Sequence, residues 1–73
     1  MTVVTIRLEH DQALVLFEML ARRSETGGRV SAEHEGERRV LEELETMLET
    51  ELVEPFAPNY RDLLAEARER LAV

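Results

Sequence analysis

Residues 40–52 read VLEELETMLETEL, and apolar side chains recur through this stretch at the spacing of an α-helix. The stripe consists of Val40, Leu41, Leu44, Met47, Leu48 and Leu52. Steps of three, four and seven residues place such side chains on one side of a helix. Most of the other positions are glutamates, so the stretch predicts a helix of about residues 31–51 with an apolar inner face and an acidic outer face.

The whole net charge of the chain falls in the segment around this helix. Residues 33–54 hold nine carboxylates and two arginines, a balance of −7, and the remaining residues balance to zero. Concentrated negative charge repels phosphate and attracts cationic surfaces. We therefore expect a basic protein partner and not nucleic acid.

Glu42, Glu45 and Glu49 lie on the outer side of the predicted helix, three and four residues apart. Like charges at this spacing destabilise an isolated helix slightly, so they serve no purpose within the helix itself. We expect this face to dock an arginine-rich or otherwise basic partner. A solvated surface that confers solubility and a divalent cation site are the alternatives, although no calcium-loop pattern is present.

Residues 2–8 alternate between two faces and are rich in β-branched side chains, a pattern typical of a half-buried β-strand. One face holds Val4, Ile6 and Leu8, and the other holds Val3, Thr5 and Arg7. A strand needs a partner for its backbone N–H and C=O groups. That partner is either Leu52-Val53 of the same chain or the strand of a second chain.

Helical patterns also cover residues 9–24 and about 60–71, with a glycine-containing connection at 25–30 after the first. Ser31 is the expected N-cap of the second helix and Asn59 that of the third. Phe56, between two prolines, is expected to fill the core at a corner of the chain. The predicted fold class is α+β, mostly α: a single small domain over residues 1–73, with one N-terminal strand followed by three helices.

A chain of 73 residues without cysteine has a small core and no disulfide support. Oligomerisation is one remaining source of stability, so we expect a homodimer. Its interface is predicted to contain the strand residues Val4, Ile6 and Leu8, together with Val15 and Met19 on the far side of the first helix. Simple surface exposure of Val15 and Met19 is the alternative.

Nothing in the sequence predicts an enzyme. No nucleophile–base motif, phosphate loop or metal-ligand spacing is present, so no catalytic residue, metal or cofactor is expected. His10 and His34 are expected to be exposed residues without a role. The longest unbroken apolar run, residues 13–17, is far too short to span a membrane, and a cytoplasmic protein is expected.

The segment Val4-Thr5-Ile6-Arg7-Leu8, followed by a helix, a glycine-containing turn and a serine-capped helix, resembles the ribbon-helix-helix family over residues 3–50. In that family two chains pair their strands into a ribbon whose outward residues enter the DNA major groove. The resemblance implies that Thr5 and Arg7 would contact DNA in a transcription factor or antitoxin. In an antitoxin, residues 52–73 would fold onto the partner instead of onto the chain's own core.

Three segments are also similar to short hypothetical proteins of high-GC bacteria. They are residues 13–18, 39–45 and 52–60. This resemblance implies a compact bacterial protein of one domain and no catalytic residue. The function we expect is that of a non-enzymatic interaction module, regulatory or antitoxin-like, that docks through Glu42, Glu45 and Glu49, with the DNA-binding protein as the alternative.

Overall fold

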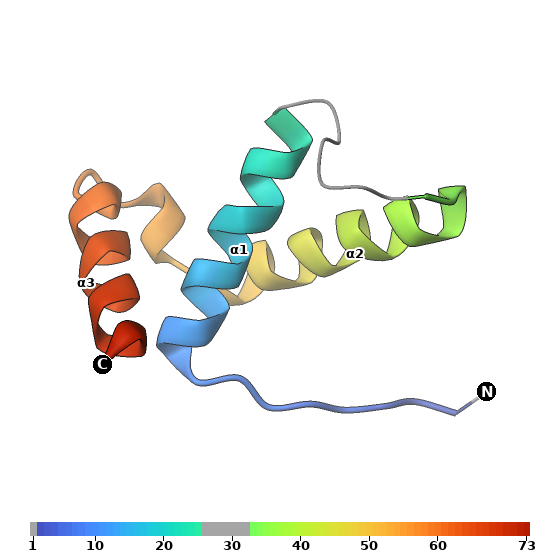
Figure 1. Ribbon diagram of the computed structural model, residues 1–73, viewed down its shortest axis with the longest axis horizontal. Helices are drawn as coiled ribbons and strands as arrows, with labels where there is room; N and C mark the ends of the chain where they lie inside the picture. Colours follow the sequence, from blue (N-terminus) through green and yellow to red (C-terminus); the bar gives the residue numbers. More distant parts are fainter. Residues whose placement is uncertain (1, 26–32) are drawn as a thin grey trace.

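The structure, a computed structural model, describes residues 2–25 and 33–73, and these form helices joined by short connections. The elements are α1 (His10–Glu25), α2 (Glu35–Glu51), a 3₁₀ turn η1 (Glu54–Phe56) and α3 (Tyr60–Ala72). Helix α1 packs against both α2 and α3, which lie on its two sides (Figure 1). The first half of α2 extends beyond α1.

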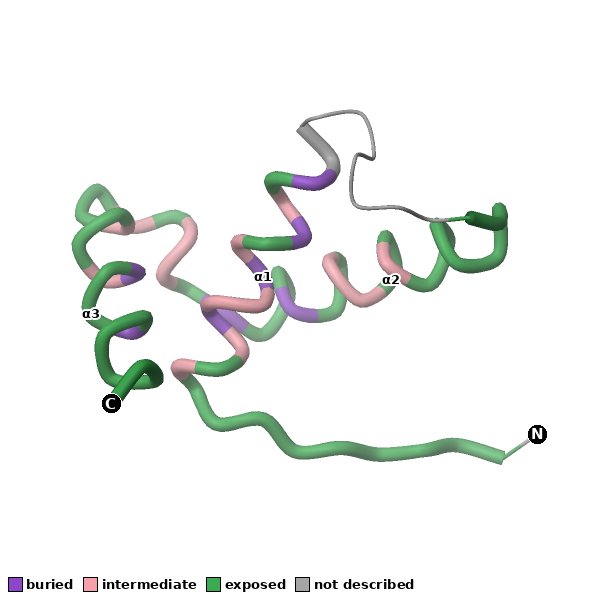
Figure 2. Tube along the Cα trace, viewed as in Figure 1, coloured by how far each residue is buried: buried purple, intermediate pink, exposed green. Residues whose placement is uncertain are grey.

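The predicted N-terminal strand is wrong, and with it the α+β fold class and a strand paired across a homodimer. The described residues contain no strand, and the fold is all-helical. Residues 2–8, which we call the arm, are extended and exposed throughout (Figure 2). No backbone hydrogen bond joins the arm to any other part of the chain that the structure describes.

Leu52 and Val53, predicted to pair with the strand within the chain, instead connect α2 to η1. The N–H of Leu52 donates to the carbonyl of Leu48 at 3.0 Å and so closes the last turn of α2. Val53 then precedes η1, which contains Pro55. Alternation describes two faces of an extended segment, but a strand forms only where a second edge is available.

The helix boundaries agree closely with those expected for α1 and α3. In α1, Asp11 lies in the first turn and Arg22 and Arg23 lie in the last, a distribution that complements the helix dipole. Helix α2 begins later than expected, and His34 is its N-cap, accepting a hydrogen bond from the Gly36 N–H at 2.9 Å. The expected cap, Ser31, lies outside the described residues.

The core lies where the three helices meet at the middle of α1. Its buried members are Leu14, Phe17, Leu20, Leu48, Leu52, Leu64 and Ala67. Phe56, expected in the core, is instead 72% exposed. Two members of the α2 stripe, Val40 and Met47, are also exposed, because α1 covers only part of α2.

Val40 and Met47 are therefore apolar side chains of α2 that the described part of the fold leaves uncovered. An apolar helix face that its own fold leaves uncovered is a feature of interaction surfaces.

Candidate functional site

The structure places the three predicted docking carboxylates on α2. Glu42 and Glu49 are exposed, and Glu45 is half-buried. Positions 42, 45 and 49 share one side of an α-helix. They form what we call the outer acidic face.

Two arginines of α2 lie near this face, and their partners are fixed locally. Arg39 Nε lies 3.0 Å from Glu43 Oε1, and Arg38 pairs with Glu35. The hydrogen bond with Glu35 raises the pKa of Arg38, and the nearby charge of Glu42 raises it further. Both ion pairs are largely exposed, so each is worth little to stability.

The residues predicted for the dimer interface do not all share one environment. Val4 and Ile6 are 84% and 71% exposed, and Leu8, which leads into α1, is 40% exposed. Met19 is 51% exposed, whereas Val15 is half-buried and packs against the core. Val15 therefore presents only part of its side chain to any partner.

Thr5 and Arg7, the residues implied for DNA contact, are both exposed on the arm. Arg7 forms no ion pair with the described residues of its own chain. One cation on each chain offers little attraction to a phosphate backbone.

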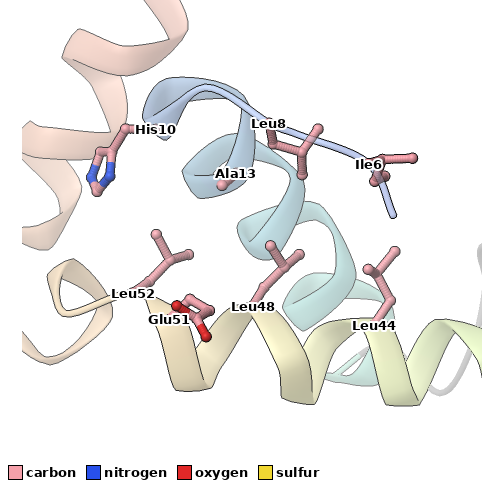
Figure 3. A pocket seen from close by; sticks show the side chains of 8 residues that line it. All are labelled: Ile6, Leu8, His10, Ala13, Leu44, Leu48, Glu51 and Leu52. Atoms are coloured by element: carbon pink, nitrogen blue, oxygen red, sulfur yellow. The ribbon is translucent and has the colours of Figure 1, made fainter. Parts of the chain in front are cut away.

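An apolar hollow of about 430 Å³ separates the arm from the second half of α2. Leu44, Leu48 and Leu52 point from α2 toward the arm and form its floor, as Figure 3 shows. Ile6 and Leu8 come from the arm itself, and the remaining lining residues are His10, Ala13 and Glu51. We refer to this feature as the α2 hollow.

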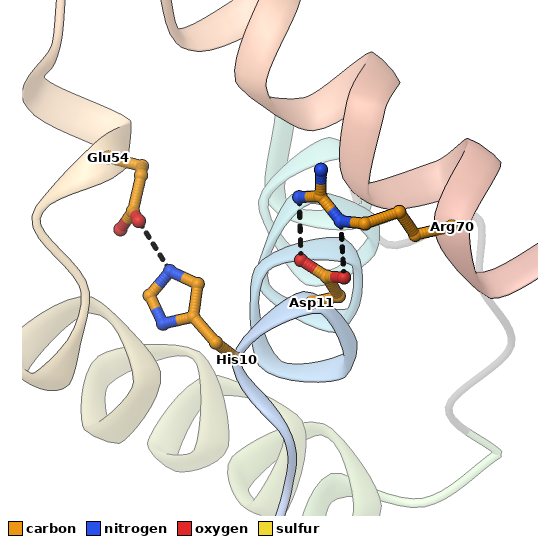
Figure 4. A network of polar contacts seen from close by, with 4 residues as sticks. All are labelled: His10, Asp11, Glu54 and Arg70. Carbon is orange, nitrogen blue, oxygen red and sulfur yellow. Dashed lines mark hydrogen bonds and ion pairs between the residues drawn. The ribbon is translucent and has the colours of Figure 1, made fainter.

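Two polar ties hold the first turn of α1 (Figure 4), and no pattern in the sequence indicated either of them. His10 contacts Glu54 of η1, and Arg70 of α3 donates to both oxygens of Asp11 at 2.7 and 2.9 Å. His10 was expected to be without a role, yet it links α1 to η1. The partners are 44 and 59 residues apart in sequence, so only the packing of the helices brings them together.

Both ties favour the ionised carboxylates. The hydrogen bond from Arg70 holds the pKa of Asp11 below its usual value. The pKa of Glu54 is also lowered, first by a hydrogen bond from its own backbone N–H and then by His10, against the opposing effect of burial. These are structural roles and require no substrate.

Tyr60 and Arg23 are two further polar residues that the sequence did not single out. The Tyr60 hydroxyl donates to Glu18 at 2.9 Å, which joins the start of α3 to α1. Burial, and then this hydrogen bond, raise the pKa of Tyr60 to about 12. Arg23 is buried, and its Nη2 lies 3.4 Å from the carbonyl oxygen of Arg38 in α2.

Among the described residues, no group of three or more His, Cys, Asp or Glu side chains is arranged to hold a metal ion. None of the described helices combines the length and the apolar character needed to cross a membrane.

Comparison with models of protein families, with curated proteins and with solved structures finds no match to this chain. The two resemblances drawn from the sequence therefore stay predictions.

Proposed function

We propose that the chain is a non-enzymatic interaction module that docks a cationic protein segment on its outer acidic face. The observation that carries the proposal is the position of Glu42 and Glu49. Both are exposed on α2, and the ion pairs of Arg38 and Arg39 go to other carboxylates. The face therefore retains negative charge that a basic partner can neutralise.

Charge at an exposed face acts mainly by steering a partner and selecting its sign. An arginine-rich segment suits such a face, because guanidinium groups bind carboxylates in a bidentate manner. Binding of this kind weakens as salt is added. An antitoxin or another regulatory protein that holds a basic partner is one form of this function.

The test uses an oligo-arginine peptide as a defined probe, with binding measured by calorimetry at several salt concentrations. The variant changes Glu42, Glu45 and Glu49 to Gln. The matched control removes the same charge from exposed positions of α3, by Asp62→Asn, Glu66→Gln and Glu69→Gln. We expect affinity to fall at least about tenfold more in the α2 variant than in the control.

Equal losses in the two variants would show that only net charge matters and would remove the outer acidic face from consideration. Because Glu45 is half-buried, a second variant keeps it and changes only Glu42 and Glu49. Circular dichroism of each variant checks that the helices are retained.

We also propose that the chain forms a homodimer. The exposed apolar side chains of the arm and of α2 support this, since association would remove them from water. Sedimentation equilibrium of the wild-type chain is the direct measurement. A mass of one chain at high concentration would refute the dimer and leave the outer acidic face to be judged by peptide binding alone.

DNA binding is the second candidate function, favoured by the exposure of Thr5 and Arg7 on the arm. It requires salt-sensitive, sequence-specific binding to the region upstream of the chain's own gene, lost in Arg7→Ala. No mobility shift at low salt would count against it. The acidic character of α2 makes the basic protein partner the stronger proposal.

A further inference from the structure

One line of side chains on α2 has an apolar centre and a carboxylate at each end. Since successive residues of an α-helix differ by about 100°, five positions of α2 lie within about 80° of one another around the helix. They are Glu37, Val40, Leu44, Met47 and Glu51, which we call the α2 seam. Alternating steps of three and four residues separate them, and this is the spacing of the contact positions of a coiled coil.

The centre of the α2 seam is only partly covered by its own fold. Val40 is 62% exposed, Met47 is 58% exposed and Leu44 is half-buried. A hollow of about 390 Å³ lies beside Glu37 and Val40, and the α2 hollow lies beside Leu44 and Glu51. Three apolar side chains in one row are therefore accessible to a partner, with a hollow at either end of the row.

The arm borders the α2 seam without covering it. Ile6 and Leu8 face α2 across the α2 hollow, as Figure 3 shows, yet Ile6 is 71% exposed. No backbone hydrogen bond ties the arm to the described part of the chain. The α2 hollow therefore has α2 on one side and the arm on the other, with apolar side chains on both.

The charges of the α2 seam favour a cationic partner. Glu37 and Glu51 form no ion pair with the described residues. Glu37 accepts a hydrogen bond from the Glu33 N–H at 3.0 Å, but this bond does not neutralise its charge. Two heptads separate Glu37 from Glu51, so the two carboxylates lie about 21 Å apart along the helix axis.

A second copy of the chain does not match the α2 seam. If the α2 helices of two copies packed on one another, Glu37 would meet Glu37 in a parallel pair and Glu51 in an antiparallel pair. Like charges set against one another across an interface cost free energy. A partner that covers the α2 seam must therefore be a different protein with cations at these positions, and the proposed homodimer is left with the arm as its exposed apolar surface.

We propose that the α2 seam docks an amphipathic, basic helix of a different protein. Apolar side chains of that helix pack on Val40, Leu44 and Met47, and an arginine or lysine beyond each end of the apolar row pairs with a carboxylate of the seam. The partner helix therefore carries three apolar residues at steps of four and three, between basic residues about two heptads apart.

The α2 seam adds a second surface to the proposed interaction module and does not depend on the outer acidic face. Glu42 and Glu49 lie on the opposite side of α2 from the seam, because they are turned by more than about 140° from Leu44. The two surfaces can therefore be altered separately.

The first test uses a synthetic helical peptide as the probe. It has leucine at the three apolar positions and arginine at the two basic positions, in a background of alanine and glutamine. A control peptide of the same composition carries its arginines on the opposite side of the helix from its leucines. We expect calorimetry to show that the wild-type chain binds the probe at least about fivefold more tightly than the control peptide. Equal affinities, or no binding of the probe, overturn the proposal.

Two matched methionines test the apolar centre of the α2 seam. Met47→Gln changes the seam, and Met19→Gln changes a position of similar exposure on α1. We expect the dissociation constant of the probe to rise at least about fivefold in Met47→Gln and less than about twofold in Met19→Gln. Circular dichroism checks that both variants keep their helices. Equal changes in the two variants overturn the proposal.

Two pairs of glutamates separate the α2 seam from the outer acidic face. Glu37→Gln/Glu51→Gln removes the charged ends of the seam, and Glu42→Gln/Glu49→Gln removes the same charge from the outer acidic face. We expect the first pair to weaken probe binding at least about threefold more than the second. Glutamine at position 37 can still accept the hydrogen bond from the Glu33 N–H, so the start of α2 is retained.

The same variants distinguish failure of the α2 seam from failure of the proposed docking function. Loss of probe binding in Glu42→Gln/Glu49→Gln alone overturns the seam and leaves the outer acidic face as the docking surface. The oligo-arginine titration judges the outer acidic face independently.

Other occupants of the α2 seam give different results. If the partner helix packs between α2 and the arm, Ile6→Gln weakens probe binding through loss of an apolar contact. If the arm itself covers the seam in its own chain, Ile6→Gln strengthens probe binding, and this result overturns the proposal. A wild-type homodimer that is lost in Met47→Gln and kept in Met19→Gln would place a second copy on the seam and would also overturn it.

Discussion

Tyr60 provides a direct measurement of the packing between α1 and α3. It is the only tyrosine, and the chain has no tryptophan, lysine or cysteine. Between about pH 9 and pH 11 no other side chain titrates, because arginine stays protonated. Absorbance at the phenolate wavelength therefore reports the ionisation of one residue. Burial of Tyr60, and its hydrogen bond to Glu18, raise its pKa to about 12.

The sign of the effect on stability follows from which state holds the proton. In the unfolded chain a tyrosine has a pKa of about 10, so at about pH 11 the unfolded state has lost its proton while the native state retains it. The free energy of unfolding therefore falls as pH rises from 10 toward 12, and the full contribution is present below pH 10. The difference between the native and the unfolded pKa of Tyr60 lowers the free energy of unfolding by about 1.4 kcal/mol at pH 11. Solvent screening of this half-exposed residue reduces the expected loss to about 1 kcal/mol.

The assay is urea unfolding followed by circular dichroism at a series of pH values, with the phenolate absorbance recorded in parallel. Tyr60→Phe should make the free energy of unfolding nearly independent of pH in this range. It should also lower stability at neutral pH by about 1 kcal/mol, because the hydrogen bond to Glu18 is lost. A native ionisation midpoint near pH 10, or equal pH dependence in wild type and Tyr60→Phe, would refute the assigned environment of Tyr60.

Three further substitutions test other parts of the fold by the same unfolding measurement. Leu14→Ala should lower the free energy of unfolding by about 2–5 kcal/mol because Leu14 is 2% exposed. Phe56→Ala should lower it by less than about 1 kcal/mol because Phe56 is 72% exposed. Similar losses in the two variants would contradict the assigned core. In wild type the ionised Asp11 raises the free energy of unfolding above the normal carboxyl pKa, and this contribution is lost as pH falls through the lowered pKa of Asp11. Asp11→Asn and Arg70→Gln should each remove this contribution. His34→Ala should cost about 1 kcal/mol through loss of the cap on α2, and an unchanged midpoint would show that the cap contributes nothing.

The helices were predictable because their signals are local. Apolar spacing located α1, α2 and α3, and the dipole-compatible charges of α1 agree with its observed ends. Spacing and charge are local signals, and they do not specify how the helices pack against one another. The stripe of α2 includes Val40 and Met47, but both are exposed, although Leu48, next to Met47, is buried. Which part of the stripe α1 covers depends on how the two helices pack, and spacing does not specify this.

The prediction of a strand was wrong for a related reason. Alternation in residues 2–8 records which side chains share a face, but it carries no information about a pairing edge. The candidate partner within the chain, Leu52-Val53, cannot pair through the Leu52 N–H, because this group donates to the Leu48 carbonyl at the end of α2. Likewise Pro55 and Pro58 correctly indicated a break in the helical pattern, but not that Phe56 between them would face solvent.

The polar ties could not be derived from the sequence. Asp11 was recognisable as a first-turn residue, yet its partner Arg70 lies near the other end of the chain. The sequence neighbours of His10 suggest no role for this residue, because its partner Glu54 is 44 residues away in the chain. Helical periodicity puts Glu42, Glu45 and Glu49 on one side of α2, but it does not indicate that Glu45 is half-buried.

The ties at the start of α1 also make a fixed pivot for the arm. His10 and Asp11 are held to η1 and α3, and the arm leaves the molecule immediately before them. Eight steps of extended backbone, from His10 to Thr2, span at most about 26–29 Å. The molecule, with the arm included, measures 35 × 30 × 25 Å, so the span of the arm is comparable to the width of the molecule. The arm is thus a tether of set length, and any contact made by residues 2–8 must lie within that radius of His10.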